Sequence, residues 1–218
     1  MRIVIIGAHG KVARLLTPLL RQRGHEVTGL VRNPDHVTDV EADGAGARVL
    51  DIESADVDAI AEVFRGHDSV VWSAGAGGGD PRRTYAVDRD AAIRSMEAAA
   101  STGVRRYVMV SYFGAGPDHG VPEDNPFFAY ADAKTTADAA LAGSDLDWTI
   151  LRPSGLTTET GTGHIETSLG GASAGSVTRA DVALVVAETL ARPRLAGASV
   201  ELNNGEVPVA EALAAYER

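Results

Sequence analysis

The first twenty residues, MRIVIIGAHGKVARLLTPLL, constrain the fold of this chain more than any other stretch. Residues 3–6 form a short apolar, β-branched run of the kind found in strands that are buried on both faces. The run stops at Gly7, Gly10 and Ala13 follow at three-residue intervals, and apolar residues then recur at helical spacing. The pattern predicts a strand, a tight glycine turn and a helix.

The sizes of these residues suit a turn that binds a pyrophosphate. Gly7 permits the turn, Gly10 lets the pyrophosphate approach the backbone, and the small Ala13 lets the helix pack on the strand. The N-terminus of the helix offers free N–H groups and the positive end of its dipole. Gly7 and Gly10 are therefore the first candidate cofactor-binding residues.

Strand and helix patterns alternate along nearly the whole chain. Further strands are expected at 27–31, 48–52, 68–73, 106–111 and 147–151, and an edge strand at 199–202. Helices are expected at 57–64, 83–100, 126–141, from 178 onwards and at 209–216. This alternation predicts an α/β fold of the Rossmann type, a doubly wound parallel sheet with helices on both faces, as a single domain over 1–218. The stretches 113–125 and 153–175 show no regular pattern and are expected to be loops that contact the substrate.

Composition excludes several classes of function. The net charge of −10 argues against a nucleic-acid partner, because phosphate binding favours a basic surface. Without cysteine the chain has no disulfide or thiol chemistry, and its six histidines show no metal-ligand spacing, so we expect no metal site. There is no signal-peptide pattern and no apolar run of roughly 18 residues, so we expect a cytoplasmic protein that binds a small molecule and no membrane. The sequence carries no signal for the oligomeric state.

Two residues that follow predicted strands bear on the choice of cofactor. NAD is usually met after the second strand by an acidic residue that binds the ribose 2′-hydroxyl, but here the strand ends in Arg32. A guanidinium suits a 2′-phosphate and favours NADP, with NAD still possible; the alternative is a solvated arginine at a strand end. Asp51, after the third strand, is a candidate acceptor for the adenine amino group, and the alternative is a helix cap.

The sharpest catalytic signal is Tyr130-Ala-Asp-Ala-Lys134. A spacing of four on a helix puts tyrosine and lysine on one face. An adjacent ammonium lowers the pKa of a phenol, so Tyr130 is expected to give a proton to a carbonyl oxygen that receives hydride. Ser111, at the end of the fifth strand, is expected to face the same carbonyl; the alternative is a serine that satisfies loop backbone.

Nine stretches of the chain together resemble an atypical short-chain dehydrogenase/reductase. They are IIGAHGKVARLL, LVRNP, VLDIES, VVWSAGAGGG, YAVDRDAAIRSMEAA, GVRRYVMVSYFGA, YADAKTTAD, LDWTILRPSGLT and the GTG before His164. This NAD(P)-binding group includes NAD-dependent epimerase/dehydratase-like and flavin-reductase-like proteins, and the resemblance covers nearly the full length.

The resemblance implies the remaining cofactor contacts. It implies a pyrophosphate turn lined by Gly7, His9, Gly10, Lys11 and Val12. It implies a 2′-phosphate on Arg32 and Asn33, an adenine between Asp51 and Ile52, a ribose over Ala74 and Gly75, and a nicotinamide amide near Pro153. Lys134 would orient the nicotinamide ribose.

The resemblance also implies a catalytic set. The standard members use Asn, Ser, Tyr and Lys, and here Ser111, Tyr130 and Lys134 match. Asp88 stands where the asparagine would be, which puts the usual proton relay in question. The alternative for Asp88 is a helix-surface or capping carboxylate.

These observations predict an NADP(H)-dependent oxidoreductase acting on a small carbonyl, quinone or flavin-like substrate. Phe113, Phe127, Phe128 and Leu156 are candidates for an apolar pocket around a flat compound. One alternative is a non-catalytic NADP(H)-binding redox sensor, since fold alone does not separate the two. A sugar epimerase/dehydratase is disfavoured, because those enzymes carry a substantial C-terminal substrate domain and only a short segment follows the sixth strand here.

Overall fold

The computed structural model describes residues 1–77 and 79–218, so Gly78 of the VVWSAGAGGG stretch lies outside the described residues. Its main sheet is built from β1 (Arg2–Ile6), β2 (Glu26–Val31), β3 (Gly46–Val49), β4 (Ser69–Trp72), β5 (Arg106–Val110), β6 (Asp147–Pro153), β8 (His164–Thr167), β10 (Ala198–Asn204) and β11 (Val207–Pro208). The strands lie in the order β11-β8-β10-β6-β5-β4-β1-β2-β3. Every pairing from β10 to β3 is parallel. The antiparallel β8 and β11 extend the sheet beyond β10.

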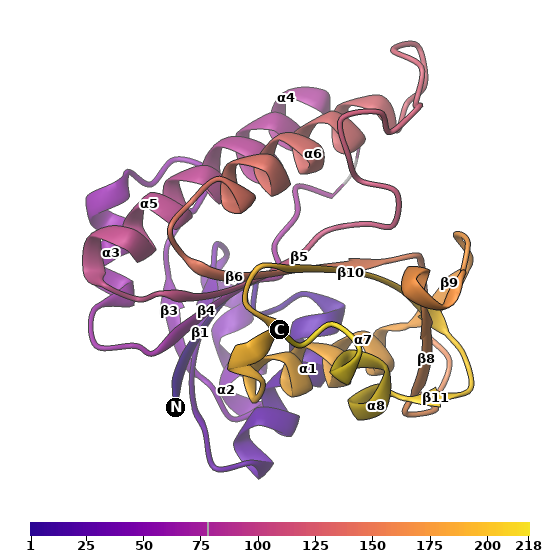
Figure 1. Cartoon of the computed structure of the whole chain (residues 1–218). Helices are drawn as coiled ribbons and strands as arrows, with labels where there is room; N and C mark the ends of the chain where they lie inside the picture. Colours follow the sequence, from indigo (N-terminus) through magenta and orange to yellow (C-terminus); the bar gives the residue numbers. More distant parts are fainter. Residues whose placement is uncertain (78) are drawn as a thin grey trace.

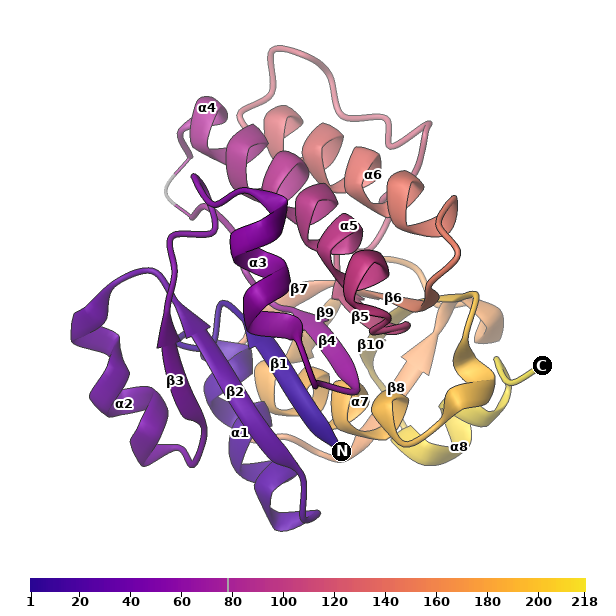
Figure 2. The same cartoon turned by 90° about the vertical axis from the view of Figure 1, so that its left-hand side faces the viewer.

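Helices cover both faces of this sheet (Figure 1). One face carries α1 (Lys11–Gln22), α2 (Val37–Ala42), α7 (Arg179–Leu190) and α8 (Val209–Ala214). The other face carries α3 (Val57–Phe64), α5 (Ala92–Thr102) and α6 (Phe128–Ala142), with α4 (Pro81–Thr84) and a π-helical segment, Tyr85–Ala91, leading into α5. Figure 2 shows α3, α5 and α6 lying beside one another over the sheet. The predicted doubly wound Rossmann-type α/β fold is confirmed.

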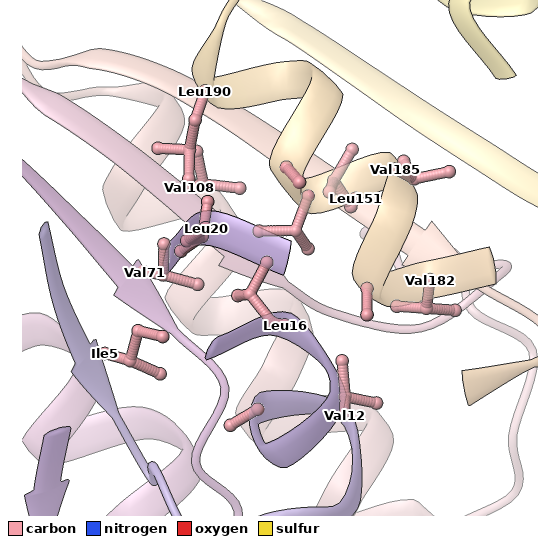
Figure 3. Packing of buried hydrophobic residues seen from close by; sticks show 14 of the residues in the cluster. Ile5, Val12, Leu16, Leu20, Val71, Val108, Leu151, Val182, Val185 and Leu190 are labelled. Carbon is pink, nitrogen blue, oxygen red and sulfur yellow. The ribbon is translucent and has the colours of Figure 1, made fainter. Parts of the chain in front are cut away.

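Two apolar layers follow from the alternation of side chains along the strands. Toward α1 and α7, Ile5 and Val71 pack with Leu16 and Val182 in one buried cluster (Figure 3). On the strands, the residues next in sequence to those of this cluster point to the opposite face of the sheet, toward α3, α5 and α6. Their layer includes Trp72, Tyr107, Met109 and Ile150. Burial on both faces explains why the central strands read as continuous apolar runs.

The opening unit has the predicted form. β1 ends at Ile6, and Gly7 takes a positive φ of 81° in the turn before α1. Gly103 ends α5 with a left-handed φ of 76°, as its position after the long helix predicts. Thr178 caps α7 by accepting a hydrogen bond from the Asp181 backbone N–H at 3.0 Å, where the sequence predicts that this helix starts.

Three predictions about strands and loops need correction. The third strand lies at Gly46–Val49 and not at 48–52, because only that segment pairs with β2. The strand expected at an edge, β10, lies inside the sheet between β6 and β8. The stretch 153–175 is not a plain loop, since it contains β8 and also β7 (Gly155–Thr157), which pairs with β9 (Ser176–Thr178). These short strands have partners remote in sequence, so local periodicity does not reveal them.

Candidate functional site

A pocket of about 290 Å³ lies where β1, β2 and β4 end, at the carboxyl edge of the parallel strands. We name it the glycine-turn pocket. It brings together nine of the predicted cofactor-binding residues: Gly7, His9, Gly10, Arg32, Asn33, Asp51, Ile52, Ala74 and Gly75. Four others do not line it: Lys11, Val12, Lys134 and Pro153. Val12 is buried in the core beneath the turn, and Lys11 is exposed at the start of α1.

The glycine turn leaves room that a side chain would fill. A Cβ on Gly7 would lie 2.6 Å from the Cα of Ala74, so only glycine fits between β1 and the loop after β4. Gly10 is the N-cap of α1, and no side chain caps the free N–H groups of the first helical turn. An uncapped helix N-terminus that opens on a glycine-lined pocket suits a pyrophosphate. The cradle therefore fits the phosphates of a dinucleotide.

Charged residues gather at the far end of this pocket. The Nη1 of Arg32 lies 3.4 Å from the Oε2 of Glu53, and the Nε of Arg83 donates to the same oxygen at 3.1 Å. All three side chains line the pocket. Sequence analysis found Arg32 but missed Glu53 and Arg83, because α4 is distant in sequence from the loops that it meets. Two guanidiniums and one carboxylate leave a net positive charge in this part of the pocket, which suits an anion. The carboxylate of Glu53 would compete with that anion for the two arginines.

Two other predicted residues are engaged in local turns. Asn33 accepts a hydrogen bond from the Asp35 backbone N–H at 3.1 Å, which starts the turn after β2. Asp51 accepts from the Glu53 backbone N–H at 3.2 Å, while Asp56 is the N-cap of α3. The alternative interpretation of Asp51 as the helix cap was therefore wrong, and Asp51 lines the pocket.

His9 lies in the wall of the pocket and is held there by α2 and its neighbours. Its ring stacks on His36 with a centroid distance of 3.6 Å, and its Nε2 lies 2.9 Å from the Oδ2 of Asp39. Arg14 contacts the same carboxylate at 3.2 Å. The predicted contact of His9 with phosphate would thus use a ring whose Nε2 already faces a carboxylate.

A second pocket, of about 460 Å³, lies where β5 and β6 end, next to the glycine-turn pocket along the sheet. We name it the aromatic pocket. It contains Ser111, Tyr130 and Pro153 from the sequence predictions. Of the residues expected to form apolar walls, Phe113, Phe127 and Leu156 line it. Phe128 does not; its ring packs edge-on against His119 at 5.7 Å.

Lys134 is buried and lines neither pocket. Its side chain is 1% exposed, and its Nζ donates to the Val110 carbonyl oxygen at 2.9 Å. Burial lowers the pKa of Lys134, and the carboxylates of Asp88 and Asp138 act against that shift. The ammonium thus lies between two acidic groups and against β5.

This arrangement corrects the expected effect of Lys134 on Tyr130. The pKa of Tyr130 is raised, by burial first and then by the negative charges of Asp88 and Asp138. The expectation of a lowered phenol pKa was wrong, because the two carboxylates and burial dominate the environment of the ring. Tyr130 consequently keeps its proton at neutral pH, the state that a proton donor requires.

Asp88 is a buried carboxylate in the π-helical segment before α5. It is 1% exposed, and its Oδ2 accepts a hydrogen bond from the Ala76 backbone N–H at 2.9 Å. Burial raises the pKa of Asp88, with Lys134 opposing the shift, and its Oδ1 has no hydrogen-bond partner. The alternatives of a helix-surface or capping carboxylate were wrong. Asp88 holds the loop after β4, which lines the glycine-turn pocket.

A second buried acid at this site, Asp138, was not predicted from the sequence and is 2% exposed. Its Oδ2 accepts hydrogen bonds from the Oγ of Ser111 at 2.9 Å and the Nε of Arg152 at 3.0 Å. Burial raises the pKa of Asp138, and the charges of Lys134 and Arg152 oppose that shift. The sequence spacing could have indicated this residue, because Asp138 lies four residues after Lys134 and so on the same face of the helix.

Comparison with known proteins identifies the family. Residues 7–193 match the family described as NAD(P)H-binding. The chain belongs to this family. The match spans both pockets, and it agrees with the predicted resemblance to atypical short-chain dehydrogenases/reductases. As a member of the NAD(P)H-binding family, the protein takes a nicotinamide cofactor.

Several relatives match this NAD(P)H-binding protein over nearly its whole length. The "Uncharacterized sugar epimerase YhfK" of Bacillus subtilis is 33% identical and covers 98% of this chain and 99% of its own. A solved protein of Bacillus halodurans, called "Putative NAD-dependent epimerase/dehydratase", is 34% identical, with a TM-score of 0.90 and 99% of both chains covered. The oxidoreductase ylbE of Lactococcus lactis is 27% identical, with a TM-score of 0.87 and coverage of 99% and 96%. The protein is thus related to oxidoreductases and to epimerase-like proteins.

Two further features concern only the part of the chain that the structure describes, residues 1–77 and 79–218: metal-binding clusters and membrane-spanning helices. These residues contain no group of three or more histidine and acidic residues placed to hold a metal ion. No helix among them combines the length and the apolar character that crossing a bilayer requires.

Proposed function

We propose that this protein is an NADP(H)-dependent oxidoreductase that acts on a small carbonyl, quinone or flavin-like substrate. The observation that carries the proposal is the adjacency of the two pockets. The glycine-turn pocket lies at the ends of β1, β2 and β4, and the aromatic pocket with Tyr130 lies at the ends of β5 and β6, the next strands of the sheet. A ligand site beyond these strand ends is what a doubly wound sheet favours.

The preference for NADP over NAD rests on charge. Arg32 and Arg83 present two guanidiniums to the glycine-turn pocket, and a guanidinium fits a phosphate with paired hydrogen bonds. Asn33 lines the same end of the pocket. Glu53 sets a limit on the preference, since its carboxylate already engages both arginines.

The chemistry assigned to the aromatic pocket is proton donation. The bound cofactor supplies or accepts hydride. Tyr130 faces the pocket with its phenol protonated and donates that proton to the substrate oxygen. Lys134 anchors α6 to β5 through the Val110 carbonyl and so positions Tyr130 four residues earlier, and we assign it the contact with the nicotinamide ribose. Asp88 supports the loop after β4.

The proposal is tested by a screen of NADPH oxidation with carbonyl, quinone and flavin substrates, followed by variants on the best substrate. Tyr130→Phe removes the proton donor and keeps the ring, so turnover should fall about 10²- to 10⁴-fold with cofactor affinity unchanged. Tyr112→Phe is the matched control from the same pocket and should stay near the wild-type rate. Lys134→Ala should weaken cofactor binding as well as turnover. An unchanged rate for Tyr130→Phe would remove that residue as the acid.

The relatives support a second candidate, because the name of the Bacillus subtilis protein includes sugar epimerase and its length matches this chain. An epimerase would use the same two pockets with no net consumption of cofactor. Conversion of a nucleotide sugar without NADPH loss would favour it. Tight NADPH binding with no turnover on either panel would favour the redox-sensor alternative.

A further inference from the structure

The hydroxyl of Ser111 is already committed inside the protein. Its Oγ donates to the Oδ2 of Asp138 at 2.9 Å, and the Nε of Arg152 donates to the same oxygen at 3.0 Å. Asp138 is 2% exposed, and its other carboxylate oxygen has no partner. Lys134 adds its positive charge nearby. These groups keep the serine hydrogen directed toward α6 and away from the aromatic pocket.

A serine hydroxyl has one hydrogen to donate and two lone pairs to accept with. Because that hydrogen is used by Asp138, Ser111 presents only lone pairs to the pocket that it lines. Turning the hydroxyl toward a ligand would remove a hydrogen-bond donor from the buried carboxylate of Asp138. Losing a hydrogen bond to a charged group costs more free energy than losing one between neutral groups. Ser111 therefore accepts hydrogen bonds from a ligand, contrary to the carbonyl-facing donor that sequence analysis expects.

Three aromatic rings lie together in the lining of this pocket. The rings of Tyr112, Phe127 and Tyr130 contact one another with centroid distances of 5.2–5.6 Å. The ring of Tyr112 lines the pocket, but its hydroxyl oxygen is buried away from solvent. Ser154 also lines the pocket, and its Oγ accepts a hydrogen bond from the Gly175 backbone N–H at 3.1 Å, so its own hydrogen is free. Tyr130 and Ser154 are therefore the hydroxyls that can donate here, and Ser111 is the one that accepts. A flat ring packs well on such a cluster.

We infer that the Asp138–Arg152 pair fixes Ser111 as a hydrogen-bond acceptor, so that the aromatic pocket selects flat conjugated compounds bearing an N–H or O–H donor as well as an oxygen acceptor. Lactams, imides and hydroxyquinones have this chemistry. Asp138 is a positioning residue in this inference, because it acts through Ser111. The inference rests on the proposed function only in taking the aromatic pocket as the substrate site.

Paired probes test the inference by binding alone. The dissociation constants of 2-naphthol and 2-methoxynaphthalene are measured by fluorescence; the two share a flat ring, and only the first has a donor. Wild-type protein should bind 2-naphthol about 3- to 10-fold more tightly, the worth of one net hydrogen bond. Ser111→Ala should abolish the discrimination. Equal affinities of the wild-type protein for the two probes, or no binding of either, would overturn the inference.

Asp138→Asn tests the positioning role of Asp138, because a purely structural role would not change the preference between the two probes. The new amide has an oxygen for Arg152 and an N–H for the Oγ of Ser111, which frees the serine hydrogen for the pocket. The preference should then shift toward 2-methoxynaphthalene. Asp132→Asn, the same change on the same helix, is the control and should keep the wild-type preference. An unchanged preference in folded Asp138→Asn would contradict the role of Asp138. Absence of NADPH turnover would count against the proposed oxidoreductase and leave these binding results intact.

Discussion

Replacing Gly7 by alanine should destabilise the protein more than its small size suggests. The residue has a φ of 81°, and a left-handed conformation costs an alanine roughly 1–2 kcal/mol. The added Cβ would also lie 2.6 Å from the Cα and 2.8 Å from the N of Ala74. Both are backbone atoms that no rotamer change can move, so β1 and the loop after β4 must separate, at an overpacking cost of about 1–3 kcal/mol.

Gly24 provides the matched control. Its φ is 77°, and a Cβ there would meet no atom within 4 Å. Gly24→Ala therefore carries the conformational cost alone, about 1–2 kcal/mol, whereas Gly7→Ala should lose about 2–5 kcal/mol. For a chain of this size each kcal/mol lowers Tm by roughly 2–4 °C.

Thermal unfolding followed by circular dichroism measures both variants. Gly7→Ala should melt about 2–12 °C below Gly24→Ala, a gap that reports the backbone clash. Gly7→Ala should also lose affinity for NADPH, since the turn that forms the pocket has moved. Equal melting temperatures for the two variants would refute the argument that the turn is closed against Ala74.

Two further perturbations follow from the charged networks. Glu53→Gln removes the carboxylate that competes for Arg32 and Arg83, so calorimetry should show NADPH binding tighter by about five-fold with NADH little changed; a loss of NADPH affinity would contradict this. For Asp181, burial alone would raise the pKa, yet hydrogen bonds from the Thr162 backbone and Asn204 lower it overall. A lowered pKa adds stability above the unfolded-state value of about 3.9 that is lost as the pH falls through the folded-state pKa. The free energy of unfolding, measured with urea below about pH 4, should therefore depend less on pH in Asp181→Asn than in the wild-type protein. An unchanged dependence would count against these hydrogen bonds to Asp181.

The features that sequence predicted well are those coded locally. The β1 turn and α1 depend on glycine positions and apolar spacing within twenty residues, and both act through neighbours in the chain. The succession of strands and helices along the chain followed from the alternation of periods. The contacts of the glycine-turn pocket with Arg32 and Asp51 also followed, because they come directly after strands.

The features that sequence did not predict depend on distant partners. Arg83 meets Glu53 across thirty positions, and Asp138 is recognisable as part of the site only once Ser111 and Arg152 lie beside it. The direction of the Lys134 side chain was predicted from helical spacing alone. Its burial against β5 between two carboxylates is a property of packing, and it reversed the expected shift in the pKa of Tyr130.

The central claim is that the glycine-turn pocket takes NADP(H), and calorimetric titration of NADPH and NADH tests it most directly. The wild-type protein should bind NADPH more tightly, because Arg32 lies where an acidic residue would meet the ribose of NAD. Arg32→Asp, which restores such an acid, should reverse the preference. Equal affinities in the wild-type protein, or a preference that Arg32→Asp leaves unchanged, would contradict the account.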